Sequence, residues 1–210
     1  GQPVPLSSFA STEWVTGPMQ TIRYNGYPSM KLTGEPAPGY SSGQALAEME
    51  FMLRLRGNRL GALVDLLREA GYLPAAIGGA PQQTLYGLMQ GFIDLVIEHN
   101  GAYYVLDYKT NRLGDTPAAY NAAGLTQAMG RAHYDLQYLI YTVALHRHLR
   151  QALGDAYDPA RHLGGVQYLF VRAMDGQTGA GVFIDKPPVE LVEALDALFD
   201  AEQPDQSLTA

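Results

Sequence analysis

No cysteine occurs in the 210-residue chain, and this absence excludes several kinds of chemistry. Without a thiol the protein has no disulfide, no thiolate nucleophile and no cysteine-ligated zinc or iron–sulfur centre. The absence also fits a reducing compartment, where disulfides are rare. No apolar run approaches the roughly 18 residues that cross a bilayer, and the first residues, Gly1-Gln-Pro-Val-Pro, do not resemble a signal peptide. We therefore expect a cytoplasmic protein with no membrane partner.

A GxxxxGK[ST] nucleotide-binding motif is absent too, so we expect no ATP site in this chain. Basic residues are in the minority, and the net charge of −7 argues against a protein that coats nucleic acid non-specifically. That charge still permits an enzyme that reaches phosphate groups through a metal ion. The remaining composition, 47% hydrophobic and 17% charged, is ordinary for a globular domain, and this length suits one domain better than two.

The chain divides into three parts by composition. Residues 1–43 are rich in Gly, Pro, Ser and Thr and show no clear periodicity, apart from a short strand predicted near residues 21–27. We predict an irregular lead-in there, a main domain over residues 44–201 and a tail over residues 202–210. The periodicities of the main domain follow the order strand, helix, hairpin, helix, strand, helix. This order predicts an α/β or α+β domain with a central mixed sheet.

Hydrophobic spacing and turn residues give the expected bounds of these elements. Strands are predicted at Leu46–Leu53, in a hairpin over Leu85–Thr110, at Gly165–Ala173 and at Val182–Asp185. Helices are predicted at Arg59–Ala70, Ala128–Leu153 and Pro188–Phe199. Turns or loops are predicted at Gly78–Gln83, at Asn111–Thr126 (with a short helical piece) and at Asp175–Gly181.

The hairpin is the most informative part of the sequence. It contains Asn100-Gly101 between two apolar strands, which is the strongest short signal for a two-residue hairpin turn. In such a hairpin the numbers of directly opposed residues add to a constant, which is 201 here. Asp94 and Asp107 satisfy this sum. The sequence therefore predicts two facing aspartates with their Cβ atoms about 4.5–5.5 Å apart.

Lys109 follows Asp107 by two residues, so we expect both side chains on the same face of the strand. Like charges that oppose each other destabilise a sheet, and a cation between the carboxylates removes that cost. Mg²⁺ prefers oxygen ligands and keeps several waters, so one or two carboxylates can hold it. The hairpin thus predicts a site for Mg²⁺, with Mn²⁺ as a substitute, suited to phosphodiester cleavage. The Lys109 ammonium would orient the attacking water or stabilise negative charge.

Each of these residues also has a plainer interpretation. Asp94 could be a surface carboxylate, and Lys109 could carry its ammonium into solvent at a strand end. Glu48 and Glu50 lie on the polar face of the predicted strand 46–53, which is a routine position for solvated glutamates.

Several blocks of the sequence, in order, resemble one family. They are Gly91-Phe-Ile-Asp94 with Tyr-Tyr-Val-Leu-Asp-Tyr-Lys-Thr-Asn-Arg-Leu-Gly (103–114), His133-Tyr-Asp-Leu-Gln-Tyr-Leu-Ile-Tyr-Thr-Val-Ala-Leu-His-Arg (133–147) and Gly-Gly-Val-Gln-Tyr-Leu-Phe-Val-Arg (164–172). The first carries the D…(D/E)xK pattern of the PD-(D/E)xK nuclease superfamily. Together they resemble the nuclease domain of RecB-type helicase–nuclease subunits over residues 45–200, which implies a restriction-endonuclease-like core.

The resemblance implies a role for each matched residue. Asp94, Asp107 and the main-chain carbonyl of Tyr108 match the family's metal ligands. Lys109 matches its catalytic lysine. A glutamate on the preceding strand completes the catalytic set, and Glu48 is favoured over Glu50 for this place. Alternation alone puts both glutamates on one face.

Gln137 and Tyr141 match the family's QxxxY motif. Residues four apart on a helix share a face, which the resemblance implies is turned towards the site and the DNA backbone. Tyr134 would extend that face. The plainer alternative is an ordinary helix in which the Tyr141 ring packs into the core.

The family also has a metal-ligating histidine upstream of the glutamate, whereas no histidine precedes His99 here. We therefore expect a fragment of a longer subunit, with weakened metal affinity and low activity in isolation. The implied function is that of an exodeoxyribonuclease V-type exonuclease in DNA repair and recombination. It would cut single strands delivered from duplex ends by the helicase part of the subunit, with RecC- and RecD-like partners.

Two alternatives stay open. One is a non-catalytic nuclease-like module that scaffolds or contacts partner subunits, which the presence of both aspartates and the lysine disfavours. The other is a freestanding restriction-type or repair endonuclease, which the acidic charge disfavours.

Overall fold

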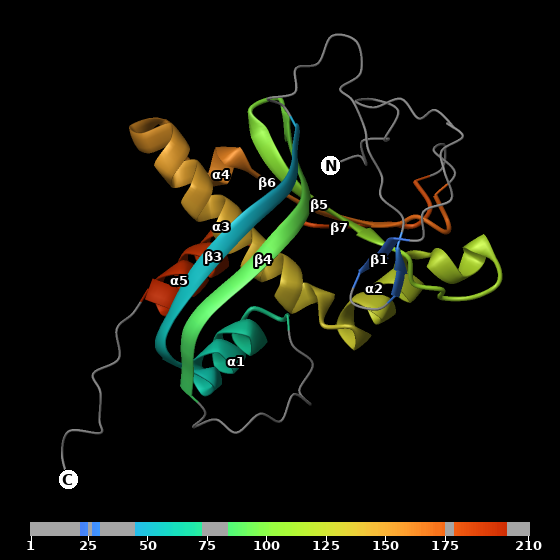
Figure 1. The fold of residues 1–210 in the computed structure, drawn as a ribbon, viewed down its shortest axis with the longest axis horizontal. Helices are drawn as coiled ribbons and strands as arrows, with labels where there is room; N and C mark the ends of the chain where they lie inside the picture. Colours follow the sequence, from blue (N-terminus) through green and yellow to red (C-terminus); the bar gives the residue numbers. More distant parts are fainter. Residues whose placement is uncertain (1–21, 25–26, 30–44, 73–83, 175–178, 201–210) are drawn as a thin grey trace.

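The computed structural model describes residues 22–24, 27–29, 45–72, 84–174 and 179–200. These residues form a five-stranded mixed sheet with helices around it (Figure 1). The predicted fold class, α/β with a central mixed sheet flanked by helices, is confirmed. The predicted tail, the predicted turn at Gly78–Gln83 and most of the predicted lead-in lie outside the described residues. The proposed division into three parts stays a prediction.

The strands of the sheet follow the order β3-β4-β5-β6-β7, in which β5 and β6 are parallel and all other neighbours are antiparallel. Their bounds are β3 (Ala45–Arg59), β4 (Thr84–His99), β5 (Ala102–Lys109), β6 (Leu163–Phe170) and β7 (Val182–Asp185). A separate two-stranded sheet pairs β1 (Ile22–Tyr24) with β2 (Tyr27–Ser29), at the position of the strand predicted near residues 21–27.

The helices are α1 (Leu60–Glu69), α2 (Ala122–Arg131), α3 (Tyr134–Leu153), α4 (Pro159–His162) and α5 (Val189–Asp200), with 3-10 turns η3 (Pro117–Tyr120) and η4 (Gly154–Ala156). In Figure 1, α3 crosses one face of the sheet, and α5 and α1 lie next to β3 and to each other. None of the helices in the described part of the chain is long and apolar enough to cross a membrane.

The main core lies between the sheet and helices α1, α3 and α5, because alternate strand residues point towards these helices. Met49, Phe51 and Leu53 are buried there, as their alternation predicts. A smaller apolar cluster on the opposite face of the sheet forms around Leu106 and Leu169. The sheet is therefore covered on both faces near β5, which keeps the end of this strand away from bulk water.

The hairpin between β4 and β5 confirms the predicted register. Asn100 and Gly101 have φ angles of 54° and 78°, the left-handed conformations that a type I′ turn requires. The paired residues run from His99↔Ala102 to Leu95↔Leu106, so each pair adds to the expected constant. The ladder ends one position short of Asp94 and Asp107.

The predicted long helix Ala128–Leu153 is wrong, because two helices occupy this region. Part of the predicted loop Asn111–Thr126 belongs to α2, and α3 begins only at Tyr134. His133 lies between them with φ of 53°, a left-handed conformation that interrupts a right-handed helix. Apolar spacing continues through this break, so the periodicity does not reveal it. The break makes Tyr134 and Gln137 part of the first turns of a new helix.

Two strands differ from the predicted bounds. β3 continues to Arg59 and not only to Leu53, because it stays paired with β4 along nearly its whole length. The bounds of β6 lie earlier than the predicted Gly165–Ala173, since its parallel pairing with β5 begins at Leu163. Pairing with a neighbour, rather than local apolar spacing, sets these ends.

A charged cluster joins α5 to α3. Asp196 of α5 is 8% exposed and accepts hydrogen bonds from the guanidinium groups of Arg147 and, at 2.8 Å, Arg150. Burial opposes ionisation of Asp196, but the two arginines outweigh this effect and hold its pKa below the usual range. The cluster therefore stabilises the packing of α5 against the helix that carries Gln137.

We expect Asp196→Asn to lower the free energy of unfolding by about 1–2 kcal/mol at pH 7, a modest value because Arg150 is largely exposed. The native pKa of Asp196 lies below its unfolded value of about 3.9, so the unfolded chain binds more protons in acid. The stabilisation by Asp196 is thus present above about pH 4 and is lost as the pH falls through the native pKa. Urea unfolding of both proteins from pH 7 to pH 3 checks this, and a difference that stays constant with pH would contradict it.

Candidate active site

The C-terminal end of β5 brings together the two charged residues predicted to share a face. Asp107 is 3% exposed and Lys109 is 9% exposed. Lys109 Nζ lies 2.6 Å from Asp107 Oδ2, which confirms that both side chains are on one face of the strand. A buried lysine and aspartate are uncommon unless paired. The pair therefore forms the centre of the site.

Burial raises the pKa of Asp107 to about 6, although Lys109 lowers it and the nearby Asp94 carboxylate raises it further. The Oδ2 atom accepts no well-directed hydrogen bond among the described residues, so its contact with Lys109 is an ion pair without good hydrogen-bond geometry. A buried carboxylate is stabilised by a cation beside it, here the Lys109 ammonium and, when one is bound, a metal ion. Perturbed acids in such surroundings are frequent at functional sites.

Asp94 occupies the adjacent strand but has a different environment. It is exposed, and its Oδ2 accepts a hydrogen bond of 3.0 Å from the backbone N–H of Tyr108. The side chains around it do not follow strict alternation: Ile93 packs in the main core, and Leu95 packs in the smaller cluster. This change of face at Asp94 explains why the paired ladder stops before Asp107. The two carboxylates are nevertheless close enough to interact electrostatically.

The Lys109 ammonium is surrounded on several sides. Besides Asp107, it donates a hydrogen bond of 3.0 Å to Gln137 Oε1. It also lies 3.9 Å from the ring centroid of Tyr134 and 5.0 Å from that of Tyr168, within the range of cation–π attraction. These contacts fix the position of the ammonium beside the Asp107 carboxylate.

The predicted helix face of Gln137 and Tyr141 does turn towards the site. Gln137 Nε2 donates a hydrogen bond of 2.9 Å to the Tyr141 hydroxyl, one turn later on α3. The Tyr141 ring is buried and packs edge-on against Phe51 at 5.6 Å. Tyr141 thus combines the two interpretations of the sequence, because its ring is in the core and its hydroxyl is in the site. The Tyr134 hydroxyl donates to Asn111 Oδ1, which links α3 to the loop after β5.

The backbone register of β3 with β4 shows which of the two candidate glutamates lies opposite Asp94. Pairs Ala47↔Leu95 and Met49↔Ile93 place Glu48 across from Asp94. Glu50 is exposed and accepts a hydrogen bond from Gln90 of β4. The Glu48 side chain lies outside the described residues. The preference for Glu48 stays a prediction that the register supports.

The residues present fit a divalent cation. Asp107 offers a buried oxygen without a well-directed hydrogen bond, and Asp94 offers a second carboxylate beside it. Oxygen ligands of this type suit Mg²⁺ or Mn²⁺. A third acidic or histidine ligand does not accompany them in the described side chains. The predicted main-chain ligand, the carbonyl of Tyr108, is on the same strand end.

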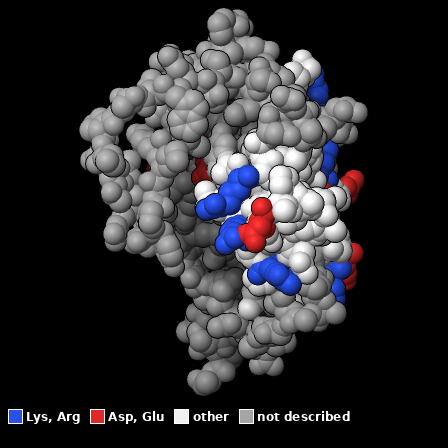
Figure 2. All heavy atoms as spheres, turned by 90° about the vertical axis from the view of Figure 1, so that its right-hand side faces the viewer, with Lys and Arg blue, Asp and Glu red and all other residues white. Residues whose placement is uncertain are grey.

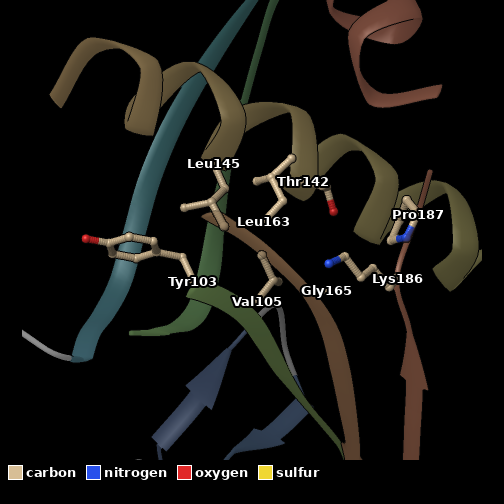
Figure 3. Close-up of a pocket in the computed structure, with 8 residues that line it drawn as sticks. All are labelled: Tyr103, Val105, Thr142, Leu145, Leu163, Gly165, Lys186 and Pro187. Carbon is tan, nitrogen blue, oxygen red and sulfur yellow. The ribbon is translucent and has the colours of Figure 1, made fainter. Parts of the chain in front are cut away.

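A small pocket elsewhere does not coincide with the site. It lies between α3 and strands β5 and β6, and its lining includes Val105, Thr142 and Lys186 (Figure 3). Tyr103 and Val105 belong to the first half of β5, whereas Asp107 and Lys109 belong to its end. None of the residues predicted for the site lines this pocket.

Two residues near the site had no role in the sequence predictions. Tyr168 of β6 is directly beside Asp107 in the parallel register, and its hydroxyl donates to Gln137 Oε1 at 3.0 Å. Arg172 follows β6, and its Nε donates to the carbonyl of Thr110 at 2.7 Å. Both occur in the block 164–172 that carries the family resemblance. Only the pairing of β5 with β6, which a sequence does not reveal, shows that they lie next to the site.

Comparison with known proteins supports this interpretation. The sequence matches the PD-(D/E)XK nuclease superfamily over residues 14–206. It is similar to the RecBCD enzyme subunit RecB of three bacteria. The identity is 46% over 155 residues in Haemophilus influenzae (73% of this chain, 13% of that protein), 37% over 190 residues in Escherichia coli (90% and 15%) and 44% over 182 residues in Mycobacterium tuberculosis CDC 1551 (81% and 16%).

The chain thus spans between 13% and 16% of the length of these three RecB relatives. Their similarity extends over most of the chain, and it confirms the resemblance to RecB drawn from the sequence blocks. The family match covers the whole of the sheet and every residue of the site described above. The chain belongs to the PD-(D/E)XK nuclease superfamily.

Proposed function

We propose that this chain is a metal-dependent DNA nuclease domain that hydrolyses phosphodiester bonds. The buried Asp107–Lys109 pair carries the proposal, because it leaves one carboxylate oxygen without a well-directed hydrogen bond next to a second carboxylate. Metal-assisted phosphodiester hydrolysis uses carboxylates that bind a metal ion. It is also helped by a fixed positive charge, such as an ammonium, that stabilises the negative charge developing on the phosphate. A module that only binds partners has no need for a desolvated pair of this kind.

Asp94, Asp107 and the Tyr108 carbonyl would hold the metal, with Glu48 across the sheet from Asp94. Mg²⁺ is the proposed ion, and Mn²⁺ is its substitute. When bound, such an ion polarises a phosphate oxygen and lowers the pKa of a coordinated water. Burial raises the pKa of Asp107 to about 6, a value still below neutral pH.

The other residues position charge and substrate. The Lys109 ammonium, held by Gln137 and the Tyr134 ring, would stabilise the negative charge that develops on the phosphate. Because this charge is fixed before the reaction, it needs little reorganisation in the transition state. Tyr134 is half-buried, and its ring would lie beside the reacting phosphate. We propose that Tyr134, Gln137 and Tyr141 form the side of α3 that contacts DNA.

Labelled single-stranded DNA tests the function directly. We expect cleavage in Mg²⁺ or Mn²⁺ and none in EDTA. Cleavage that continues in EDTA would contradict the metal-dependent mechanism. Absence of cleavage under every condition would favour the alternative of a non-catalytic nuclease-like module.

The wider role of the protein is also a proposal. Similarity to RecB supports a nuclease that acts on single strands delivered from duplex ends by a helicase part, with RecC- and RecD-like subunits, in the cytoplasm. Exonuclease action in double-strand-break repair and recombination follows from that proposal. Cleavage assays with this domain joined to a helicase of the RecB type would test it.

We further propose that Arg172 binds a phosphate of the DNA strand next to the scissile one. The backbone N–H of Val171 donates to the Lys109 carbonyl at 3.1 Å, so Arg172 is held beside the end of β5. Its Nε is bonded to Thr110, its side chain is exposed, and no carboxylate pairs with it among the described residues. On the face of the molecule where α2 lies at the right of Figure 1, Figure 2 shows several basic side chains with an acidic side chain among them.

Arg172→Gln should therefore weaken binding of single-stranded DNA and reduce the slope of log K against log salt concentration by about 0.7, the value for one phosphate contact. Arg161→Gln is the matched control, because Arg161 is exposed and lies near Gly101 at the other end of β5. Fluorescence anisotropy with a labelled oligonucleotide, between about 50 and 200 mM salt, measures both slopes. Equal slopes for the two variants would exclude a phosphate contact by Arg172.

A further inference from the structure

We propose that Tyr168 is a positioning residue for Lys109 and that it acts through the side-chain amide of Gln137. The proposal rests on the proposed nuclease function and gives a side chain of β6 a part in the site. Tyr168 is 0% exposed, and the parallel register places it directly beside Asp107.

Gln137 Oε1 accepts two hydrogen bonds, one from Lys109 Nζ and one from the Tyr168 hydroxyl, each of 3.0 Å. An ammonium group only donates, so the oxygen end of the amide must face Lys109. The nitrogen end then donates to the Tyr141 hydroxyl at 2.9 Å. This arrangement leaves one consistent assignment, in which the Tyr168 hydroxyl is a donor and holds the amide oxygen in place.

Tyr168 is suited to be a donor. Its hydroxyl lies 3.0 Å from Gln137 Oε1, and a phenolic O–H group can donate a hydrogen bond to an amide oxygen. Its ring is held by the rings of Tyr134 and Tyr138, with both centroids 5.8 Å away. Packing thus fixes the position of the ring. The hydroxyl is the part of Tyr168 that holds the amide oxygen of Gln137.

The consequence concerns the ammonium. If the hydroxyl is lost, Gln137 Oε1 keeps only Lys109 as a partner, and the amide can rotate away from the orientation that the site requires. Lys109 then keeps its ion pair with Asp107 and its contact with the Tyr134 ring but loses a fixed third partner. We expect slower cleavage, because small displacements of a charged catalytic group reduce transition-state stabilisation.

Tyr168→Phe isolates the hydroxyl, and Tyr157→Phe is the matched control. Tyr157 is half-buried, and its hydroxyl bonds to His146 Nδ1 at 2.8 Å rather than to the site. In ¹⁵N-labelled protein, we expect the side-chain amide signals of Gln137 to shift in Tyr168→Phe and to stay in place in Tyr157→Phe. Unmoved Gln137 signals in Tyr168→Phe would overturn the proposal, whether or not the chain cleaves DNA.

Single-turnover cleavage of single-stranded DNA gives the second readout. We expect Tyr168→Phe to reduce the rate about tenfold, the loss expected for one hydrogen bond, without a change in DNA affinity measured in Ca²⁺. In a Gln137→Ala background, the same substitution should have no further effect, because the two residues act as one unit. Additive losses, or an unchanged rate while the wild-type chain cleaves, would overturn the proposal. A wild-type chain that does not cleave would instead contradict the proposed function, and the Gln137 signals would still decide the contact.

Discussion

Asp107→Asn is expected to reduce DNA cleavage in Mg²⁺ about 1,000-fold, because loss of a bound metal removes several kcal/mol of transition-state stabilisation. Asparagine has the shape of aspartate but lacks the charge that a hard cation requires. The substitution leaves the buried Lys109 ammonium without its charged partner, but Gln137 and the Tyr134 ring still contact this ammonium, so we expect a loss of stability without loss of the fold. Initial rates over a range of Mg²⁺ concentrations, with circular dichroism of both proteins, measure the two effects separately.

Asp65→Asn is the matched control for this experiment. Asp65 is an aspartate of α1 whose side chain is 68% exposed and, among the described residues, forms an ion pair with Arg68 of the same helix. It should cleave DNA at the wild-type rate. Retention of more than about a tenth of the activity by Asp107→Asn would show that Asp107 does not hold the catalytic metal.

Lys109→Gln is expected to reduce the cleavage rate about 100- to 1,000-fold, the usual cost of losing one charged or hydrogen-bonding group that stabilises the transition state. Unlike the Asp107 variant, it should still bind the metal, since Lys109 adds positive charge next to the carboxylates and supplies no ligand. The two variants are thus distinguished by metal affinity. Rates at saturating Mn²⁺, together with a direct Mn²⁺ titration, measure this difference.

Lys186→Gln serves as the control for the lysine. Lys186 is exposed, follows β7, and lines the small pocket that does not include Asp107. We expect wild-type rates from it. If Lys109→Gln is rescued by raising the metal concentration, the lysine acts on metal binding, and its proposed role in transition-state stabilisation is wrong.

The sequence contains enough local information to predict the hairpin and its charged face. Asn100-Gly101 determines the turn type, and the turn determines the register, so the relation between Asp107 and Lys109 follows from spacing alone. The helix face of Gln137 and Tyr141 is similarly local, because four residues make about one turn. These are the features that the structure confirms.

Features that depend on distant contacts could not be predicted in this way. Tyr168 is brought beside Asp107 by a parallel pairing between strands that are separated by α2, α3 and α4, and no local signal specifies this register. The change of face at Asp94 depends on how β4 is covered on its two sides. The break at His133 interrupts an apolar pattern that looks continuous in the sequence.

The central claim is that Asp94 and Asp107 hold a divalent metal that DNA cleavage requires. The most direct measurement titrates Mn²⁺ into the wild-type chain and into Asp107→Asn, follows the signal of unbound Mn²⁺ by electron paramagnetic resonance, and measures single-stranded DNA cleavage in the same samples. We predict that the wild-type chain removes Mn²⁺ from solution and cleaves DNA with the same dependence on Mn²⁺ concentration, and that Asp107→Asn does neither. Equal Mn²⁺ binding by the two proteins, or cleavage by the variant at the wild-type rate, would contradict the claim.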